Sequence, residues 1–444
     1  MTQDSDSKIL DTVIVGGGIA GLTLGYRLRD RDILLLEKEE VCGGRTISRR
    51  LGDYVYNAGA QVVLGDTGPV ARLADELGVK RTLIAKSKLP FYFKGKLVSS
   101  SSQVGLLWKL PMSLGDKLRL GWSILRLRRR YGSLAKDLFD PKDSKLAEVN
   151  SSTLEEFIGQ VPRDIRTFWE VMAIDSTTVG ADTVTPFHPL MVLFFFIRDE
   201  YFVEGGTGRL TGALHDRIAS KTETGAEVLE VKEREEAVEV TYDKAGDKKT
   251  VRARRCVMAT PAPITLKAVQ GMPSWKRDAL TRIPFGSISS AAFLLSEPSE
   301  NFLGKGVWRV PVEGRKACAV TDPPFTFPRE LKERTGQGLL RVYTGDKVSK
   351  ELMQLSDGEA AEVILEDLIS MFPDIQGKVV QTDVAHWYYG IPQWQPGHTD
   401  IYESLQAPTG RLHYCGDYTS PGFMNGAVDS AYRVLEEINR AEAQ

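Results

Sequence analysis

The first forty residues show the clearest pattern of apolar and polar positions. Val13–Val15 is a short apolar run next to glycines, a helical pattern continues to about Asp30, and Ile33–Glu37 is a second apolar run. A strand, a glycine turn, a helix and a buried strand within about 30 residues make a βαβ unit. The sequence therefore predicts an α/β fold that begins with this unit.

The remaining chain changes its pattern several times. From about Leu73 to about Glu200 the pattern is mainly helical, whereas residues 227–242 alternate as in an exposed antiparallel hairpin. Strand-like segments dominate from Ser287, and a strand, a loop and a helix close the chain at 411–438. This order predicts α/β pieces at the start, in the middle and at the end.

The interleaved order predicts two domains. Residues 8–80, 204–262 and 405–444 are expected to assemble into one discontinuous nucleotide-binding domain of the Rossmann type. Residues 81–203, which are mainly helical, and residues 263–404 are expected to form an α+β substrate-binding domain over it.

Composition and charge exclude several kinds of protein. The 444 residues are 42% hydrophobic and 26% charged, as in a globular protein, and the net charge of −2 gives no sign of nucleic-acid binding. The longest apolar run, Leu190–Ile197, is far shorter than the roughly 18 residues of a membrane span, and the polar N-terminus is unlike a signal peptide. The four cysteines are far apart, so we expect a cytoplasmic protein with neither disulfides nor a metal site.

The first glycine turn contains Gly16, Gly18 and Gly21 in the spacing G-x-G-x-x-G, between a strand and a helix. The first glycine permits a tight turn, the second allows a pyrophosphate to approach the backbone, and the third lets the helix pack on the strand. The helix N-terminus then attracts the phosphates. Glu37 ends the next strand, 21 positions after Gly16, where its carboxylate can bind a ribose that has no 2′-phosphate. The unit therefore predicts a dinucleotide site.

A second glycine turn follows this unit. Gly43 and Gly44 precede Arg45, whose guanidinium can neutralise a diphosphate. Gly59 and Ala60 are small, and they suit a flat ring that lies close to the chain. On these residues alone, the choice between FAD and NAD stays open.

Three stretches together resemble the flavin-containing amine oxidoreductase superfamily: the N-terminal βαβ unit with its GGRT turn, the turn FVEGGTGRL and the C-terminal GDYTSPGFMNGAV. This group includes monoamine and polyamine oxidases, amino-acid oxidases, protoporphyrinogen oxidases and phytoene-desaturase-like enzymes. The resemblance covers nearly the whole chain. It implies a two-domain architecture like that of p-hydroxybenzoate hydroxylase, a bound FAD, and removal of hydride from a hydrophobic or amine-bearing small molecule to flavin N5.

The resemblance also implies cofactor contacts for single residues. Asp417 would bind the ribityl chain, and the N–H of Met424 would meet the pyrimidine edge of the flavin at a helix N-terminus. Gly426 and Ala427 would leave room there for the flat ring. The other implied contacts are Gly16, Gly18, Ala20, Gly21, Glu37 (ribose), Lys38, Gly43, Gly44, Arg45 (phosphates or flavin), Gly59, Ala60, Gln61, Val228 (adenine), Thr260, Trp387, Gly416 and Phe423.

The catalytic residues follow the resemblance less closely. Many amine oxidases of the superfamily carry a lysine near flavin N5 that is associated with oxygen reactivity. The matching position here is Ser290, and no lysine lies between Lys276 and Lys305. Trp394 and Phe423 would be the counterparts of the two aromatic side chains that face the flavin in those enzymes. An apolar wall of this kind excludes water from hydride transfer.

The sequence leaves the subfamily open. The GFMNGAV match favours an oxidase that acts on amines and passes electrons to molecular oxygen. Ser290 favours a protoporphyrinogen-oxidase-like or a carotenoid- or terpenoid-desaturase-like dehydrogenase with another electron acceptor. A flavin-binding protein without turnover, acting as a binding partner, is the alternative of another class. Pro392 and Gln393 stand where some relatives carry a cysteine that links FAD covalently, so we expect non-covalent FAD.

Two further groups of residues are expected to be structural. His386 and His398 flank the aromatic stretch, and each is interpreted as a structural histidine. The basic segment Arg126–Arg130 is interpreted as a solvated helix end. A membrane contact is not favoured there, because its basic positions and the nearby Trp122 and Leu125 do not separate cleanly around a helix.

Overall fold

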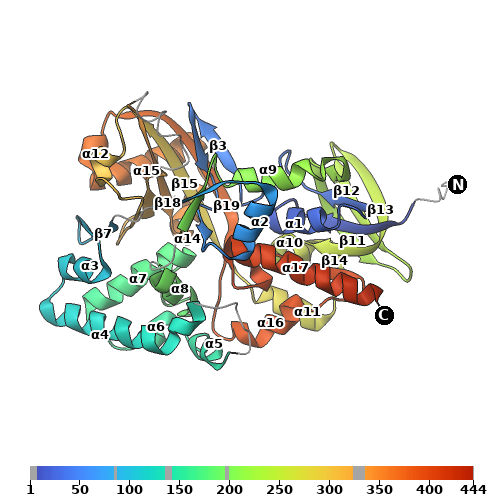
Figure 1. Ribbon diagram of the computed structural model, residues 1–444, viewed down its shortest axis with the longest axis horizontal. Coiled ribbons are helices and arrows are strands. Elements are labelled where there is room, and N and C mark those ends of the chain that lie inside the picture. Colours follow the sequence, from blue (N-terminus) through green and yellow to red (C-terminus); the bar gives the residue numbers. More distant parts are fainter. Residues whose placement is uncertain (1–7, 85–87, 136–142, 196–199, 324–335, 444) are drawn as a thin grey trace.

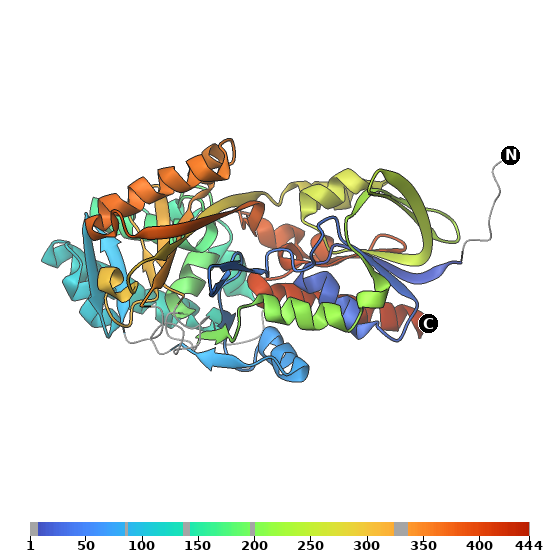
Figure 2. The ribbon, with the colours of Figure 1, turned by 90° about the horizontal axis from the view of Figure 1, so that it is seen from above.

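Two main sheets, three small sheets of two or three strands and a layer of helices form the described part of the chain (Figure 1). The larger sheet and the helix α17 (Phe423–Glu442) lie at one end of the molecule, where both termini are found. The second sheet and the helical layer lie at the other end, and Figure 2 shows the same division along the long axis. The computed structural model describes residues 8–84, 88–135, 143–195, 200–323 and 336–443.

The larger sheet has eight strands in the order β10-β2-β1-β13-β12-β11-β14, with β20 paired to β13. β1 pairs in parallel with β2 and with the last part of β13, and β20 is parallel to β13 as well. The carboxyl ends of these strands therefore share one edge, which is where ligands bind in open α/β sheets. The strands are β1 (Leu10–Val15), β2 (Ile33–Leu36), β10 (Thr222–Glu223), β11 (Ala226–Glu233), β12 (Val238–Lys244), β13 (Asp247–Met258), β14 (Val269–Gln270) and β20 (Leu412–Tyr414).

Helices cover both faces of this sheet. Ile14 packs on one face in a core with α1, α2, α9 and α17, whereas Val13 and Val15 pack on the other face with α10, α11 and α16. Successive strand residues point to opposite faces, so a continuous apolar run requires cover on both. The βαβ unit and the hairpin β11–β12 are confirmed. The helices are α1 (Ile19–Arg27), α2 (Pro69–Leu77), α9 (Gly208–Asp216), α10 (Ala262–Ala268), α11 (Ser274–Thr281) and α16 (His398–Gln406).

The second sheet is antiparallel, with five strands in the order β16-β17-β18-β15-β19. Ala291 and Phe293 pack on one face with α14 and α15, whereas Ala292 and Leu294 pack on the other with the hairpin β3–β4. The β-rich segment expected from Ser287 is confirmed. The elements are β3 (Ser48–Leu51), β4 (Tyr54–Asn57), β15 (Phe285–Leu295), α12 (Glu300–Leu303), β16 (Arg309–Pro311), β17 (Ala317–Thr321), β18 (Gly338–Thr344), α14 (Asp346–Leu352), α15 (Asp357–Met371) and β19 (Val379–Pro392).

The helical layer has its own apolar core, in which α7 and α8 are central. Its helices are α3 (Gln103–Lys109), α4 (Leu114–Tyr131), α5 (Ser144–Val149), α6 (Leu154–Ile158), α7 (Arg163–Thr177) and α8 (Phe187–Phe195). The short 3-10 helices of the chain are η1 (Gly132–Ala135), η2 (Ala219–Lys221), η3 (Pro373–Ile375) and η4 (Asp417–Thr419). Phe196 and Ile197, at the end of the longest apolar run, lie outside the described residues. Among the helices that are described, none is long and apolar enough to cross a membrane.

The expectation of few strands between Leu73 and Glu200 was partly wrong. Three short strands lie in this region, β6 (Arg81–Leu83), β7 (Leu89–Phe93) and β8 (Lys96–Ser100), and β9 (Glu200–Val203) begins at its end. β9 pairs with β6 and with the earlier β5 (Val63–Leu64) in a small sheet. Lys94 and Gly95 join β7 to β8 with φ values of 48° and 72°, which form a two-residue hairpin turn. Lys-Gly is not the usual Asn-Gly or Asp-Gly signal of such a turn, so the sequence pattern concealed it.

Candidate active site

The glycine turn between β1 and α1 is closed by backbone contacts. Gly16 has a φ of 109°, and a Cβ there would lie 2.9 Å from the carbonyl oxygen of Ala259, just after β13. A Cβ on Gly21 would overlap the carbonyl oxygen of Gly16. Where a Cβ of Gly18 would be, no described heavy atom lies within 4 Å. The turn therefore leaves bare backbone at the start of α1, which suits a pyrophosphate.

Two helices begin at this edge of the sheet without a capping side chain. The N-cap of α1 is Gly18 and that of α17 is Gly422, and neither helix has an acidic residue in its first turn. The two helices also pack against each other. Unpaired N–H groups and the helix dipole favour negative charge at each start. These starts suit the pyrophosphate expected near Gly18 and the flavin edge expected near Met424.

Glu37 is buried just after β2, and backbone groups hold its carboxylate in place. Oε2 accepts the N–H of Gly17 at 2.6 Å, and Oε1 accepts that of Glu39 at 2.9 Å. The carbonyl oxygen of Glu37 accepts the N–H of Ala226 at 2.8 Å, which brings β11 and Val228 close to it. The β11–β12 pairing shifts register after Val228, so its strand has a bulge there. The expected ribose and adenine contacts therefore lie side by side.

The second glycine turn packs directly on the first. Gly44 has a φ of 52°, and a Cβ there would lie 3.2 Å from the Cα of Gly18. The carbonyl oxygen of Arg45 accepts the N–H of Ala60 at 2.8 Å, and a Cβ on Gly59 would overlap that same oxygen. Three segments therefore meet through their backbones, which explains the small residues without reference to a ligand.

Arg45 and Asp417 form an ion pair that connects the two ends of the chain. Nη1 and Nη2 of Arg45 donate to the two carboxylate oxygens of Asp417 at 2.6 and 2.8 Å, and Nη1 also donates to the carbonyl oxygen of Gly390 at 2.9 Å. The sequence assigned these two residues to different parts of the cofactor. In the structure, their side chains instead form an ion pair with each other.

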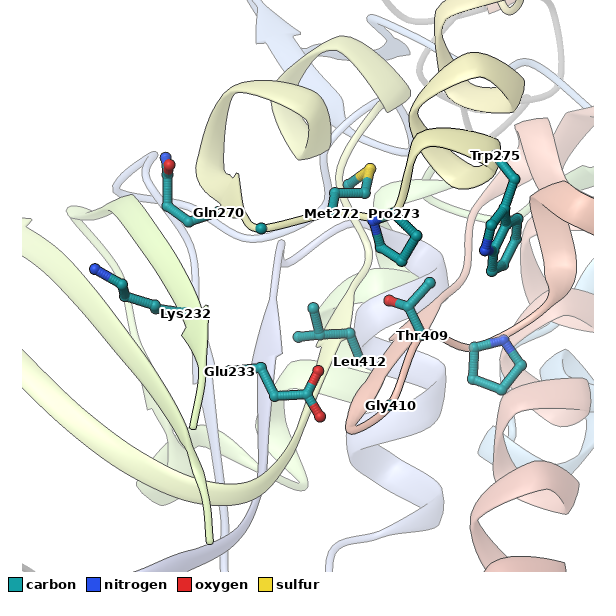
Figure 3. Close-up of a pocket in the computed structure, with 11 residues that line it drawn as sticks. Lys232, Glu233, Gln270, Met272, Pro273, Trp275, Thr409, Gly410 and Leu412 are labelled. Carbon is teal, nitrogen blue, oxygen red and sulfur yellow. The ribbon is translucent and has the colours of Figure 1, made fainter. Parts of the chain in front are cut away.

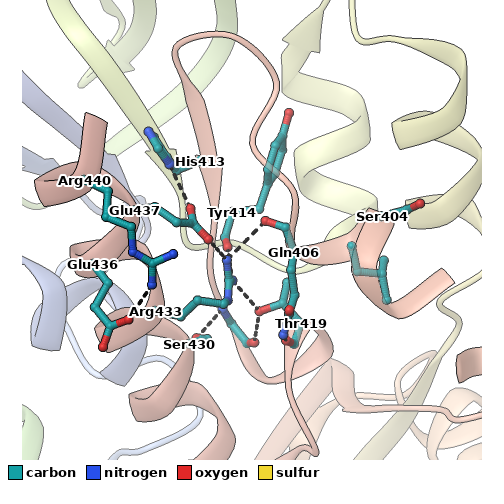
Figure 4. Close-up of polar contacts among 12 residues, drawn as sticks. Ser404, Gln406, His413, Tyr414, Thr419, Ser430, Arg433, Glu436, Glu437 and Arg440 are labelled. Carbon is teal, nitrogen blue, oxygen red and sulfur yellow. Dashed lines mark hydrogen bonds and ion pairs between the residues drawn. The ribbon is translucent and has the colours of Figure 1, made fainter. Parts of the chain in front are cut away.

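A second arginine, Arg433 of α17, holds the turn that carries Asp417 (Figure 4). Its Nη2 donates to the carbonyl oxygen of Tyr414 at 2.7 Å and to Oγ1 of Thr419 at 3.2 Å. Its Nη1 donates to the carbonyl oxygen of Gln406 at 3.1 Å and pairs with the carboxylate of Glu437. Sequence reasoning missed this residue, although its i,i+4 spacing to a glutamate on an amphipathic helix was a visible signal.

The start of α17 is under local strain. Phe423, its first residue, has a φ of 59°, a left-handed conformation that costs an L-residue roughly 1–2 kcal/mol. A Cβ on Gly426 would lie 2.9 Å from Oγ of Ser420, so the preceding loop folds back over the first turn of the helix. The glycine in this helix therefore leaves space for the side chain of Ser420, and the expected room for a flat ring stays a prediction.

Other predicted contacts lie in the surrounding core or on its surface. Ala20, Met424 and Ala427 are buried between α1 and α17. The methyl group of Thr260 lies 3.2 Å from where a Cβ of Gly16 would be. Lys38 is exposed and pairs with a neighbouring carboxylate on the surface. Gly416 donates its N–H to a hydroxyl of α17 at 2.9 Å. Their cofactor roles stay predictions.

An aromatic cluster lies beside the start of α17. Trp394 is fully buried and stacks between Phe187 and His398, with ring centroids 4.5 and 4.0 Å apart. His188 meets both Trp394 and Phe423 edge to face, each at 5.5 Å, and its Nε2 lies 3.3 Å from the carbonyl oxygen of the preceding Pro421 loop. His188 therefore stands between the two aromatic side chains that the sequence singled out, and the sequence had no signal for this place.

The two histidines of this cluster are uncharged near neutral pH. Burial lowers the pKa of His188 to about 4 and the pKa of His398 to about 3, and the neighbouring His188 and Arg282 lower the latter further. Neither ring nitrogen of His398 has a hydrogen-bond partner among the described residues. The wall next to Phe423 is therefore apolar and neutral. His386 lies elsewhere, with Nδ1 2.7 Å from Oγ of Ser289.

Comparison with known proteins decides the family. The sequence profile of the flavin containing amine oxidoreductase family matches residues 19–439. The chain belongs to this family. A probable flavin-containing monoamine oxidase A of Dictyostelium discoideum is 25% identical over 97% of this chain and 98% of its own length. A chloroplastic protoporphyrinogen oxidase of Nicotiana tabacum is 22% identical over 97% of this chain and 85% of its own length.

Solved structures share the fold. A redesigned putrescine oxidase superposes with a TM-score of 0.80 at 18% identity, over 97% of this chain and 99% of that one. Cyclohexylamine oxidase from Brevibacterium oxydans superposes with a TM-score of 0.79 at 17% identity, over 98% and 100%. The expected α/β two-domain flavoenzyme fold is confirmed. The protein is an FAD-dependent oxidoreductase of the amine oxidase type, and an inert flavin-binding partner is not favoured.

Ser290 of this flavoenzyme does not stand alone. It is buried in β15, and its Oγ accepts a hydrogen bond at 2.8 Å from Nη2 of the buried Arg341 in β18. The same guanidinium donates to the carbonyl oxygens of Asn57 and Ala58 and lies 4.4 Å from the ring centroid of Tyr343. A buried positive charge therefore stands next to the position that the resemblance linked to a lysine. In the sequence, the only sign of this charge was an arginine within an apolar stretch, and the prediction did not use it.

The loop 57–61 also accepts hydrogen bonds from Gln61 and Trp387. Nε2 of Gln61 donates to the carbonyl oxygen of Gly59 at 2.7 Å, and Nε1 of Trp387 donates to that of Ala58 at 3.0 Å. Gln61 and Trp387, both predicted cofactor contacts, therefore donate to backbone carbonyls of this loop and stabilise its conformation.

A surface cavity shown in Figure 3 is separate from this site. It has a volume of about 420 Å³, and Figure 3 shows Met272, Pro273 and Trp275 on one side of it and Glu233 on the other. It reaches the amino end of β20, whereas Asp417 follows the carboxyl end of that strand. It therefore lies at the opposite edge of the sheet.

Replacing Arg433 with methionine is expected to loosen the turn that carries Asp417. The loss leaves the carbonyl groups of Gln406 and Tyr414 without this donor and Glu437 with His413 alone, which should lower the free energy of unfolding by about 3 kcal/mol and weaken FAD retention. Urea unfolding and FAD release on dilution measure the two effects. Arg440→Met is the matched control, because Arg440 forms an exposed pair with Glu436 on the same helix. Equal effects of the two variants would contradict this role.

Ser290→Lys is expected to destabilise the flavoenzyme. The new ammonium would lie against the guanidinium of Arg341 in a buried place, which should cost about 3 kcal/mol or more in urea unfolding. Ser290→Ala should cost only about 1 kcal/mol, because it removes one hydrogen bond. Combining S290K with Arg341→Met should recover much of the loss. A stable single S290K variant would show that Arg341 does not stand where the structure has it.

The buried histidines make stability fall in acid. Unfolding raises the pKa of His398 from about 3 towards 6.5, so the unfolded chain binds the extra proton and stability decreases as the pH drops below 6.5. His398→Phe keeps the stacking and should make the decrease between pH 6 and 4 shallower by about 1.4 kcal/mol per pH unit. Melting curves over this range test it, with His215→Phe on α9 as the control. An unchanged slope would contradict a buried neutral ring.

Proposed function

We propose that this enzyme oxidises small amines with an apolar body, by removing a hydride from the carbon next to the nitrogen. The observation that carries this proposal is the neutral aromatic wall of His188, Trp394 and Phe423 beside the uncapped start of α17. The similar oxidases are named for monoamines, putrescine and cyclohexylamine, and these names support an amine substrate.

FAD fits the residues at this edge of the sheet. The bare backbone at Gly18 would hold the pyrophosphate, the buried carboxylate of Glu37 the adenosine ribose, and the start of α17 the pyrimidine edge of the flavin. Bound FAD supplies the hydride acceptor. Arg45 and Asp417 would fix the distance between the two turns that hold it. No cysteine precedes the aromatic stretch at Pro392, and the cofactor would therefore be held without a covalent bond.

The wall selects the neutral form of an amine. An ammonium that entered it would lose its water, and the nearby carboxylate of Asp417 is already paired with Arg45. His188 is uncharged near neutral pH because burial lowers its pKa to about 4, so it adds no charge to the wall. Removal of hydride requires the free electron pair of the nitrogen, which only the neutral amine has. Binding and chemistry thus require the same protonation state.

We infer molecular oxygen as the electron acceptor, because the similar proteins are named oxidases. A second candidate function, dehydrogenation of an apolar molecule with another acceptor, is favoured by Ser290 and by the similarity to a protoporphyrinogen oxidase. All four cysteines are free and buried, which supports a reducing compartment such as the cytoplasm.

Matched substrate pairs under anaerobic conditions test the proposal. Cyclohexylamine and cyclohexanol share a carbon skeleton, and putrescine and 1,4-butanediol share another. The amines should bleach the flavin absorbance, and the alcohols should not. Admitting oxygen should restore the colour and release one peroxide for each flavin reduced. Bleaching by a porphyrinogen or a polyene, with no response to any amine, would replace the proposal by the second candidate.

Phe423→Ala should lower kcat/KM for apolar amines by about 10- to 100-fold, the range expected for one lost hydrophobic contact. Tyr388→Ala is the control, because Tyr388 belongs to the nearby strand β19 and is 58% exposed. Steady-state kinetics with the reactive amines measure the effect, and melting temperatures check folding. If kcat/KM is unchanged in both variants, Phe423 is not part of the wall that contacts the substrate.

A further inference from the structure

The α3–α4 hairpin has an unusual concentration of exposed apolar side chains. Of the fourteen large hydrophobic side chains exposed in the described part of the chain, six lie between positions 104 and 125. They are Val104 (66% exposed), Trp108 (50%), Leu114 (61%), Leu118 (58%), Trp122 (64%) and Leu125 (48%). Single exposed apolar residues are normal, whereas a contiguous patch marks an interaction surface.

Helix α4 carries two separate apolar stripes. Leu120, Ile124, Leu127 and Tyr131 follow the spacing i, i+4, i+7, i+11 and pack into the core of the helical layer. Leu114, Leu118, Trp122 and Leu125 repeat at i, i+4, i+8, i+11, which is also one helical face, and all four are exposed. The two stripes are interleaved in the sequence, which is why apolar and basic positions failed to separate there. In the structure, one stripe has a partner and the other faces outward.

Basic side chains border the exposed stripe. α4 has six basic residues and one acidic residue, a net charge of +5 in a chain whose total is −2. Trp122 and Leu125 line a surface hollow of about 360 Å³ together with Arg126, Arg129 and Arg130. The guanidinium carbon of Arg126 lies 5.7 Å from the ring centroid of Trp122. Arginine forks bind phosphate oxygens, and tryptophan favours the boundary between apolar and polar phases.

We propose that the α3–α4 face docks on an anionic membrane surface. The exposed stripe would enter the boundary between headgroups and acyl chains, and the arginines around the hollow would bind lipid phosphates. Trp108, also exposed, lies at the end of α3 next to α4, because Lys117 of α4 donates to its backbone carbonyl oxygen at 2.6 Å. A second copy of the chain would bring +5 against +5, so charge opposes self-association through this face and favours an anionic partner.

The face lies at the end of the molecule away from the larger sheet and from both termini (Figures 1 and 2). α4 therefore presents its outer side without obstruction by the FAD-binding half, and the surface is available in the folded enzyme. Its residues are separate from the aromatic cluster and from both glycine turns.

Flotation of the FAD-loaded enzyme with lipid vesicles tests this proposal. Vesicles of phosphatidylcholine with phosphatidylglycerol should bind it at least about tenfold more tightly than vesicles of phosphatidylcholine alone, and added salt should weaken binding. Tryptophan emission should shift to shorter wavelength on binding. Two variants should each weaken binding about tenfold or more: L118S/W122S, which removes apolar contacts, and R126E/R129E, which reverses charge. Trp275→Ser, at a 44% exposed tryptophan of α11, should bind like the parent enzyme.

Three outcomes would overturn the proposal. The first is equal affinity of the parent enzyme for neutral and anionic vesicles. The second is equal binding by the parent enzyme and both double variants. The third is no vesicle binding together with a dimer, detected by ultracentrifugation, that L118S/W122S abolishes; this would assign the face to a second copy. Bleaching of the flavin by a soluble amine should be unchanged in all variants, which confirms that they fold and hold FAD.

Discussion

The ion pair between Arg45 and Asp417 is the interaction on which the site depends. It joins residues 372 positions apart, the turn after the first βαβ unit and the turn before the last helix. Asp417 is buried, and either charge without the other would be costly by several kcal/mol. Because the backbone of Arg45 also packs on Gly59 and Ala60, one residue joins three segments of the site. Arg433 supports this ion pair indirectly, because it holds the turn that carries Asp417.

Charge is distributed unevenly around this pair. Arg341 and Arg45 supply positive groups on the side of the loop 57–61, and both are bound by carbonyl oxygens or a carboxylate. The aromatic wall, from His188 to Trp394, carries no charge near neutral pH, because burial holds both histidines neutral. An apolar wall of this kind excludes water from hydride transfer.

The two sides of the helical layer have different proposed roles, namely docking on a membrane and contact with the substrate. Its core packs the inner stripe of α4, and its other side bears the aromatic residues of α8. The outer stripe of α4 stays exposed in the folded chain, and this exposure is the basis of the proposed membrane docking. The two stripes together explain why no single hydrophobic period describes this helix.

Local spacing determined the βαβ unit, the glycine turns and the hairpin β11–β12. These features involve residues within about 30 positions of one another, whose geometry follows from strand and helix periods. The family followed from three such stretches, at the start, in the middle and at the end of the chain, taken together. Tertiary structure alone decided that Arg45 meets Asp417, that Arg341 stands beside Ser290, that His188 lies between Trp394 and Phe423, and that Gly426 accommodates the Ser420 loop. Apart from the last, each of these contacts joins residues dozens to hundreds of positions apart. Packing selects such partners, and a single sequence carries no local signal for them. In the loop before α17 the reason is different: Ser420 reaches a residue six positions away because the chain reverses there.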